Sequence, residues 1–185
     1  MNEITAASQS IEPQHIEASS LSSNKYNALL YGYHWKSADI TYSTINEIES
    51  SFPNDYLTDN LNSLVTSRSS FSTAQAEAIS TALIKWSNVT NINVSEVKET
   101  DNSFGTIRFG LSDNVDALVS NSSAFAFFPS DVESGGDIWL NANTKDILDG
   151  KFIDTFSESS FQEGSFSYSI LVHEIGHALG LKHPF

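Results

Sequence analysis

Three of the five histidines in this 185-residue chain lie within eleven consecutive residues, and their spacing limits how the backbone there can fold. His173 and His177 are four residues apart, so on a helix their side chains project from one face about one turn apart. On a continued helix, His183 would lie roughly 9 Å further along the axis and point elsewhere. Gly180 can adopt the left-handed conformation that ends a helix. The pattern therefore predicts a helix that ends near residue 179 and a turn that brings all three imidazoles together.

Imidazole nitrogens in this arrangement are typical zinc ligands, at metal–nitrogen distances of about 2.0–2.1 Å. Three protein ligands leave the fourth position of a tetrahedral ion open to water, which distinguishes a catalytic zinc site from a structural one. Glu174 directly follows the first histidine, so its carboxylate would project towards that water and could take its proton. We therefore predict His173, His177 and His183 as zinc ligands and Glu174 as the catalytic base. A structural zinc site and a coincidental match are the alternatives, and a structural site has no use for the Glu174 carboxylate.

Composition excludes several other classes of function. The chain has 9 basic and 23 acidic residues and a formal net charge of -14, which disfavours binding to nucleic acid. This acidity indicates plain solubility, calcium binding or an extracellular location. The absence of cysteine excludes disulfides and a thiol nucleophile. No apolar run approaches the roughly 20 residues that cross a membrane, and no classical signal peptide opens the sequence.

The apolar pattern predicts strands at residues 39–43, 92–97, 106–110, 124–128 and 137–141. Ser72 can cap a helix that ends near Asn88, and a second helix begins around residues 165–167. Residues 45–68 are polar and are expected to form a loop with a weak helix. Strands alternating with helices indicate a mixed sheet with helices packed on it. We expect residues 1–24 to be a flexible lead-in or pro-segment, followed by one domain at residues 25–185.

The extended histidine motif resembles that of the metzincin proteases, and its context resembles their serralysin branch. Residues 32–35 and 40–43 are similar to the start of the serralysin protease domain. Residues 123–127, through to 136–141, are similar to its edge strand and the strand after it. The resemblance implies an α+β (α/β-like) fold of the metzincin type. In that fold a mixed, mostly parallel, five-stranded twisted sheet packs against two long helices, the second of which carries the zinc ligands.

The same resemblance implies a secreted, zinc-dependent metalloendopeptidase acting on protein or peptide substrates. Substrate would lie extended along the edge strand, which makes Ala124, Phe125, Ala126 and Phe127 the expected substrate-binding residues. Calcium sites and a C-terminal export signal are expected beyond Phe185, and the protein is expected to be a monomer.

The family's methionine-containing turn and lower lobe are not within these residues. We therefore expect residues 25–185 to form the upper lobe and to be a weak or inactive protease by themselves. The alternative function is a non-catalytic zinc-binding or interaction module that retains the ligand helix.

Overall fold

The computed structural model describes residues 16–18, 25–46, 50–52, 56, 59–101, 103–148, 151–158 and 160–184. A mixed sheet lies at its centre, with the strand order β5-β3-β6-β8-β7 and a short strand, β4, paired with β6 outside this path. The first four strands of this order run parallel, whereas β7 and β4 are antiparallel to their neighbours. The strands are β3 (Asp39–Thr44), β4 (Arg68–Ser69), β5 (Asn93–Glu96), β6 (Ile107–Ser112), β7 (Ala124–Ala126) and β8 (Ile138–Asn141). The predicted α+β fold is confirmed, and β4 adds a strand that the sequence pattern did not indicate.

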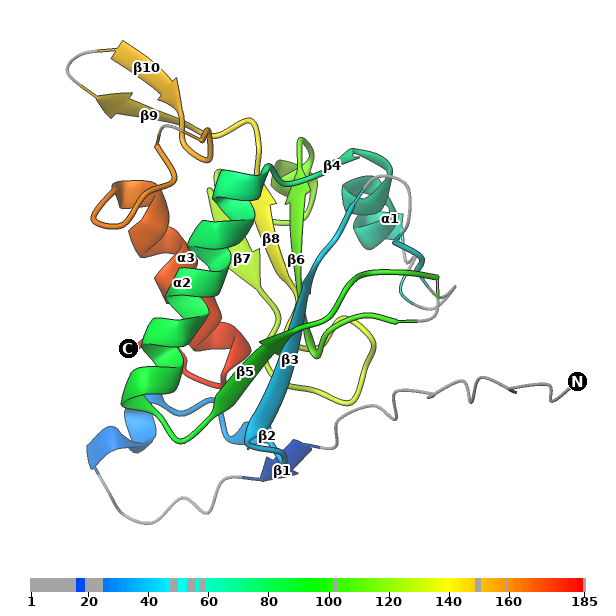
Figure 1. Ribbon diagram of the computed structural model, residues 1–185, viewed down its shortest axis with the longest axis vertical. Helices are drawn as coiled ribbons and strands as arrows, with labels where there is room; N and C mark the ends of the chain where they lie inside the picture. The colour runs from blue at the N-terminus through cyan, green and yellow to red at the C-terminus, as the bar shows by residue number, and fades with distance from the viewer. Residues whose placement is uncertain are drawn as a thin grey trace, which may run out of the picture.

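Two long helices cover one face of the sheet, and a shorter helix lies on the other face (Figure 1). The long helices begin where predicted. Ser72 and Gln75 form the reciprocal bonds of a capping box at the start of the first, and the Ser165 hydroxyl caps the second. The short helix lies within the polar stretch where a weak helix was expected. The helices are α1 (Asp59–Thr66), α2 (Thr73–Val89) and α3 (Phe166–Ala178).

Smaller elements surround this framework. They are β1 (Ile16–Ala18), β2 (Tyr33–Trp35), the hairpin β9 (Lys145–Leu148) and β10 (Lys151–Asp154), and the short 3-10 helices η1 (Lys25–Leu29) and η2 (Val115–Ala117). β1 pairs antiparallel with β2, and the β9–β10 hairpin stands apart from the main sheet (Figure 1). The boundary of the lead-in at residue 24 stays a prediction. Within the described part of the chain, we find no helix with the length and apolar character needed to cross a membrane.

Two hydrophobic cores lie on opposite faces of the sheet. The larger one fills the space between the sheet and the long helices, and it includes Phe109 from β6 together with Leu171 and Ile175 from α3. The smaller one surrounds Trp139 on the α1 side. Because successive strand residues face opposite sides, Arg108 lies on the same side as the smaller core. The sheet is therefore covered on both faces, as a mostly parallel sheet requires.

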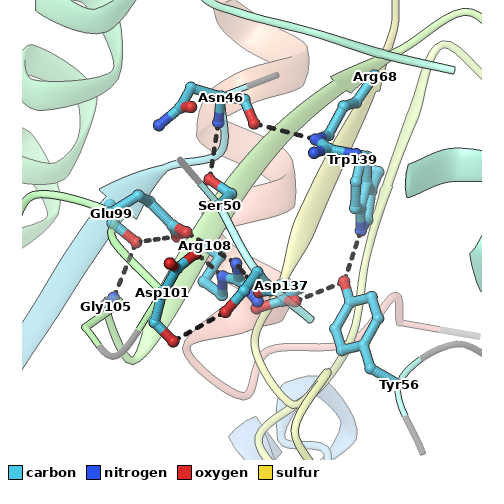
Figure 2. Close-up of polar contacts among 12 residues, drawn as sticks. Asn46, Ser50, Tyr56, Arg68, Glu99, Asp101, Gly105, Arg108, Asp137 and Trp139 are labelled. Atoms are coloured by element: carbon cyan, nitrogen blue, oxygen red, sulfur yellow. Dashed lines mark hydrogen bonds and ion pairs between the residues drawn. The ribbon is translucent and has the colours of Figure 1, made fainter. Parts of the chain in front are cut away.

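A buried ion pair lies on the α1 side of the sheet (Figure 2). The Nε and Nη2 atoms of Arg108 donate to the two carboxylate oxygens of Glu99, each at 2.8 Å, and these side chains are only 2% and 1% exposed. The Ser43 hydroxyl donates to Glu99 at 2.7 Å and accepts the Gly105 backbone N–H at 2.8 Å. These contacts tie the connection between β5 and β6 to the body of the sheet.

Candidate active site and metal centre

The turn that ends the ligand helix forms as the histidine spacing predicts. α3 ends at Ala178, and Gly180 adopts a φ of 101°, in the left-handed region. The Gly180 N–H donates to the His177 carbonyl and the Leu181 N–H donates to the Gly176 carbonyl, which are the paired bonds of a Schellman motif. A Cβ atom at position 180 would lie 2.7 Å from the Tyr33 carbonyl oxygen. Glycine is therefore required there both for backbone conformation and for space.

The structure brings the three predicted ligands together. Their Nε2 atoms are separated by 2.8 Å (His173 to His183), 3.0 Å (His173 to His177) and 3.1 Å (His177 to His183). Nitrogen ligands about 2.0–2.1 Å from a tetrahedral zinc ion are about 3.3–3.4 Å apart, so shifts of a few tenths of an ångström would admit the ion. Within the described ranges, no other group of three histidine, cysteine or acidic side chains lies close enough to share a metal.

The electrostatics of these rings suit a metal ligand. The Nδ1 of His177 lies 2.6 Å from the Leu181 carbonyl oxygen, so Nδ1–H donates and the lone pair of Nε2 faces the other two rings. Burial lowers the pKa of His173, and the neighbouring His177 and His183 lower it further. A lowered pKa favours the neutral imidazole, which is the form that binds metal. The donor set therefore fits zinc both chemically and geometrically.

Glu174 lies on α3 directly after the first of these histidines, and it is 7% exposed. Burial raises the pKa of its carboxyl to about 7. None of the described residues forms a hydrogen bond or ion pair with this carboxylate. A carboxyl group with these properties can exchange a proton near neutral pH, as general acid–base chemistry requires.

The predicted substrate-binding residues follow the edge of the sheet at β7, but their side chains divide between its two faces. Ala124 and Ala126 pack into the larger core, on the side of the ligand helix. Phe125 and Phe127 pack against the smaller core on the opposite side, with their rings in a T-shaped contact at 5.3 Å. β7 ends at Ala126, two residues earlier than predicted. The two aromatic side chains therefore face away from the histidines.

The hydrogen-bonding pattern of β7 determines which backbone groups face outwards. The Phe127 N–H donates to the Asp137 carbonyl at 2.9 Å, and Ser123 accepts from the Asn141 N–H at 2.9 Å. In an antiparallel ladder only every second residue bonds to the partner strand, and Ser123 and Phe127 belong to the set that bonds to β8. The even-numbered residues between them therefore direct their N–H and C=O groups to the free edge of the sheet. These residues are Ala124 and Ala126.

Sequence reasoning missed several groups around the histidines. The Leu181 carbonyl orients His177, and the Phe128 ring contacts the His177 ring edge-on, with centroids 5.4 Å apart. Backbone groups of residues 29–31 bond to the turn at Gly180. The similarity of residues 32–35 to the start of the serralysin protease domain marked this segment in the sequence, but it carries no information about the groups that the segment contacts.

Comparison with known proteins identifies the family to which the chain belongs. The family profile described as matrixin, a peptidase family, matches residues 55–185. The chain belongs to the matrixin peptidase family. Among curated proteins, this matrixin is similar to Serralysin G of Dickeya chrysanthemi, with 34% identity over 155 residues that cover 80% of the chain and 27% of the relative. It is also similar to a serralysin of Photorhabdus sp., with 32% identity over 126 residues that cover 68% of the chain and 23% of the relative.

A serralysin of Photorhabdus laumondii is 29% identical over 152 residues, covering 82% of the chain and 28% of the relative. The resemblance to serralysin-type proteases is thus confirmed. The matrixin described here spans about a quarter of the length of these relatives.

Proposed function

We propose that this matrixin is a secreted zinc-dependent metalloendopeptidase that hydrolyses peptide bonds in proteins. One observation supports the proposal above all others: the Nε2 atoms of His173, His177 and His183 converge within 3.1 Å of one another, and the buried carboxyl group of Glu174 directly follows the first of these ligands on α3. Secretion through a C-terminal signal and calcium binding are included from the serralysin resemblance alone, and a monomeric state is included as a separate expectation.

In this proposal, His173, His177 and His183 hold zinc, which supplies Lewis acidity to the scissile carbonyl. The Glu174 carboxylate accepts a proton from the attacking water and passes it to the departing amine. Its burial supports this role, because a pKa of about 7 lets the group both gain and lose a proton near neutral pH. The His177–Leu181 hydrogen bond keeps one ligand in the tautomer that presents Nε2 to the metal.

The substrate would bind by adding a strand to β7. Ala124 and Ala126 offer their outward N–H groups and Ala126 its carbonyl to an extended peptide, whereas the Ala124 carbonyl already accepts the Ser122 hydroxyl at 2.5 Å. The small side chains of these two residues leave room for the peptide. Because Phe125 and Phe127 pack on the far side of the sheet, they support the strand and do not contact the peptide with their rings. Backbone recognition of this kind is independent of side chains and favours broad specificity.

The purified chain is expected to bind one zinc ion, and His173→Ala is expected to lose it, because two imidazoles cannot complete the site. Elemental analysis after dialysis gives the metal content, and His15→Ala, which changes a histidine outside the predicted motif, serves as the control. Casein cleavage is followed with and without a chelator. Equal zinc content in the His173→Ala and His15→Ala proteins would contradict the proposed zinc site. Because this chain is expected to be a weak or inactive protease by itself, the zinc content decides the metal site, and chelator-sensitive cleavage would exclude the non-catalytic module.

Ala126→Pro is expected to raise KM for a peptide substrate by about tenfold, because proline removes one N–H from the outward edge of β7. Proline is tolerated where the missing N–H faces away from the partner strand, so the melting temperature should change little. Ala126→Ser retains the N–H and is the matched control. Peptidase kinetics and thermal unfolding are measured for both variants. An unchanged KM in a folded Ala126→Pro protein would rule out strand addition at this residue.

A further inference from the structure

We propose that residues 29–35, called the brace, position the third zinc ligand by holding the turn that precedes His183. The proposal rests on the proposed function, because it concerns the same metal centre. Figure 1 shows the N-terminal elements η1 and β2 beside the C-terminal end of α3, although the two segments lie at opposite ends of the sequence.

Backbone hydrogen bonds join the brace to the turn. Leu30 and Leu181 form an antiparallel bridge. On one side of it the Tyr31 N–H donates to the Gly180 carbonyl at 2.9 Å, and on the other the Lys182 N–H donates to the Leu29 carbonyl at 2.8 Å. These two bonds pair the Gly180 carbonyl in the turn and the Lys182 N–H, which directly precedes His183 in the sequence.

Side chains of the brace add two further contacts. The buried Trp35 indole donates from Nε1 to the Ala178 carbonyl, at the last residue of the ligand helix, over 2.8 Å. The Tyr31 ring stacks on Phe128 with centroids 4.0 Å apart and an interplanar angle of 6°. Phe128 in turn contacts the His177 ring edge-on. The brace therefore reaches the helix end, the turn and the ring of the second ligand.

The three ligands differ in how their backbone is supported. His173 and His177 lie on α3, where helical hydrogen bonds hold the main chain. His183 lies five residues beyond the end of that helix, on chain without regular structure. Holding such a segment in one conformation costs conformational entropy. Contacts that already order the segment before zinc binds reduce the entropy lost on binding and so raise the zinc affinity. The Leu181 carbonyl that orients His177 lies within the same braced turn, so the brace supports two of the three ligands.

The test is to remove the bond from the Tyr31 N–H to Gly180 with Tyr31→Pro, and the Trp35 indole donor with Trp35→Phe. Zinc affinity is measured by competition with a chromophoric chelator, and bound Co²⁺ is examined by its visible absorption. Outer partners of metal ligands typically contribute about 10–100-fold in affinity, and we expect a loss in this range for Tyr31→Pro. The loss for Trp35→Phe should be smaller. Tyr31→Phe keeps both the N–H and the ring and should bind zinc as the parent does.

Melting of the metal-free variants separates positioning from general stability, because a purely structural brace would lower the melting temperature without changing the zinc affinity of the folded protein. Each variant is also combined with His183→Ala. Because the brace also supports His177, Tyr31→Pro should lower zinc affinity in the His183→Ala background too, but by a smaller factor than in the parent. Unchanged affinity in both brace variants would overturn the proposal, and Trp35→Phe decides the matter if Tyr31→Pro does not fold. If His183→Ala itself leaves zinc affinity unchanged, the result contradicts the proposed three-histidine zinc site and not the role of the brace.

Discussion

Replacing Glu174 with glutamine is expected to lower the rate of peptide hydrolysis by about 10²–10⁴-fold, the usual contribution of a general base. Glutamine keeps the size of the side chain, but its amide cannot accept the proton of the attacking water. Glu174 has no hydrogen-bond partner among the described residues, so the substitution disrupts no other polar contact there. A neutral amide also suits the buried position. The fold and the zinc content are therefore expected to remain.

The rates are measured by quantifying the cleaved peptides by mass spectrometry over long incubations. With long incubations, a large decrease in rate can be detected even if the parent protein is slow. Zinc content is determined on the same samples. Glu163→Gln is the matched control, because it makes the same chemical change at an exposed side chain that pairs with Lys85 at the surface. Activity of the Glu174→Gln protein within a few-fold of the parent would exclude the carboxylate as the base.

Glu99→Leu is expected to destabilise the fold by about 3–5 kcal/mol, because it leaves the buried Arg108 cation without its partner. Phe52 and Phe104 enclose the guanidinium, with ring centroids 4.3 Å and 4.8 Å from Cζ, so water cannot easily replace the carboxylate. Burial raises the pKa of the nearby Asp137 carboxyl to about 7, with Glu99 among the groups that raise it and Arg108 opposing the shift. Removing Glu99 therefore favours the charged form of Asp137, which offsets part of the loss and places the effect at the lower end of this range.

Denaturant unfolding of the parent and of the variant gives the change in the free energy of unfolding. The double variant Glu99→Leu/Arg108→Met provides the control, since replacing both members of a buried ion pair with apolar groups costs far less than removing one. Glu163→Gln, which breaks an exposed pair, should have little effect on stability. A Glu99→Leu protein as stable as the parent, or a double variant less stable than Glu99→Leu alone, would contradict the claim that Glu99 stabilises the fold by compensating the buried charge of Arg108.

Local features of the chain were predictable from sequence because neighbouring residues carry the information. Ser72 and Gln75 form a capping box within one turn, so the start of α2 follows from four residues. The spacing of His173, His177 and Gly180 describes one helix and its end, and the three imidazoles meet as that spacing requires. Except for β4, the strands of the main sheet follow from short apolar runs, and their ends differ from the prediction by one or two residues.

Tertiary structure alone decided which distant groups meet. The sequence determined that the ligand helix ends at Gly180, but not that Trp35, 143 residues away from Ala178, would hold that end. It determined that Phe125 lies on an edge strand, but not that its ring packs away from the histidines. Nor could it pair Glu99 with Arg108 across the connection between two strands. Helical and strand periodicity record which face of an element is buried, and they carry no record of the partner that buries it. That choice depends on how the sheet and its helices pack together as a whole.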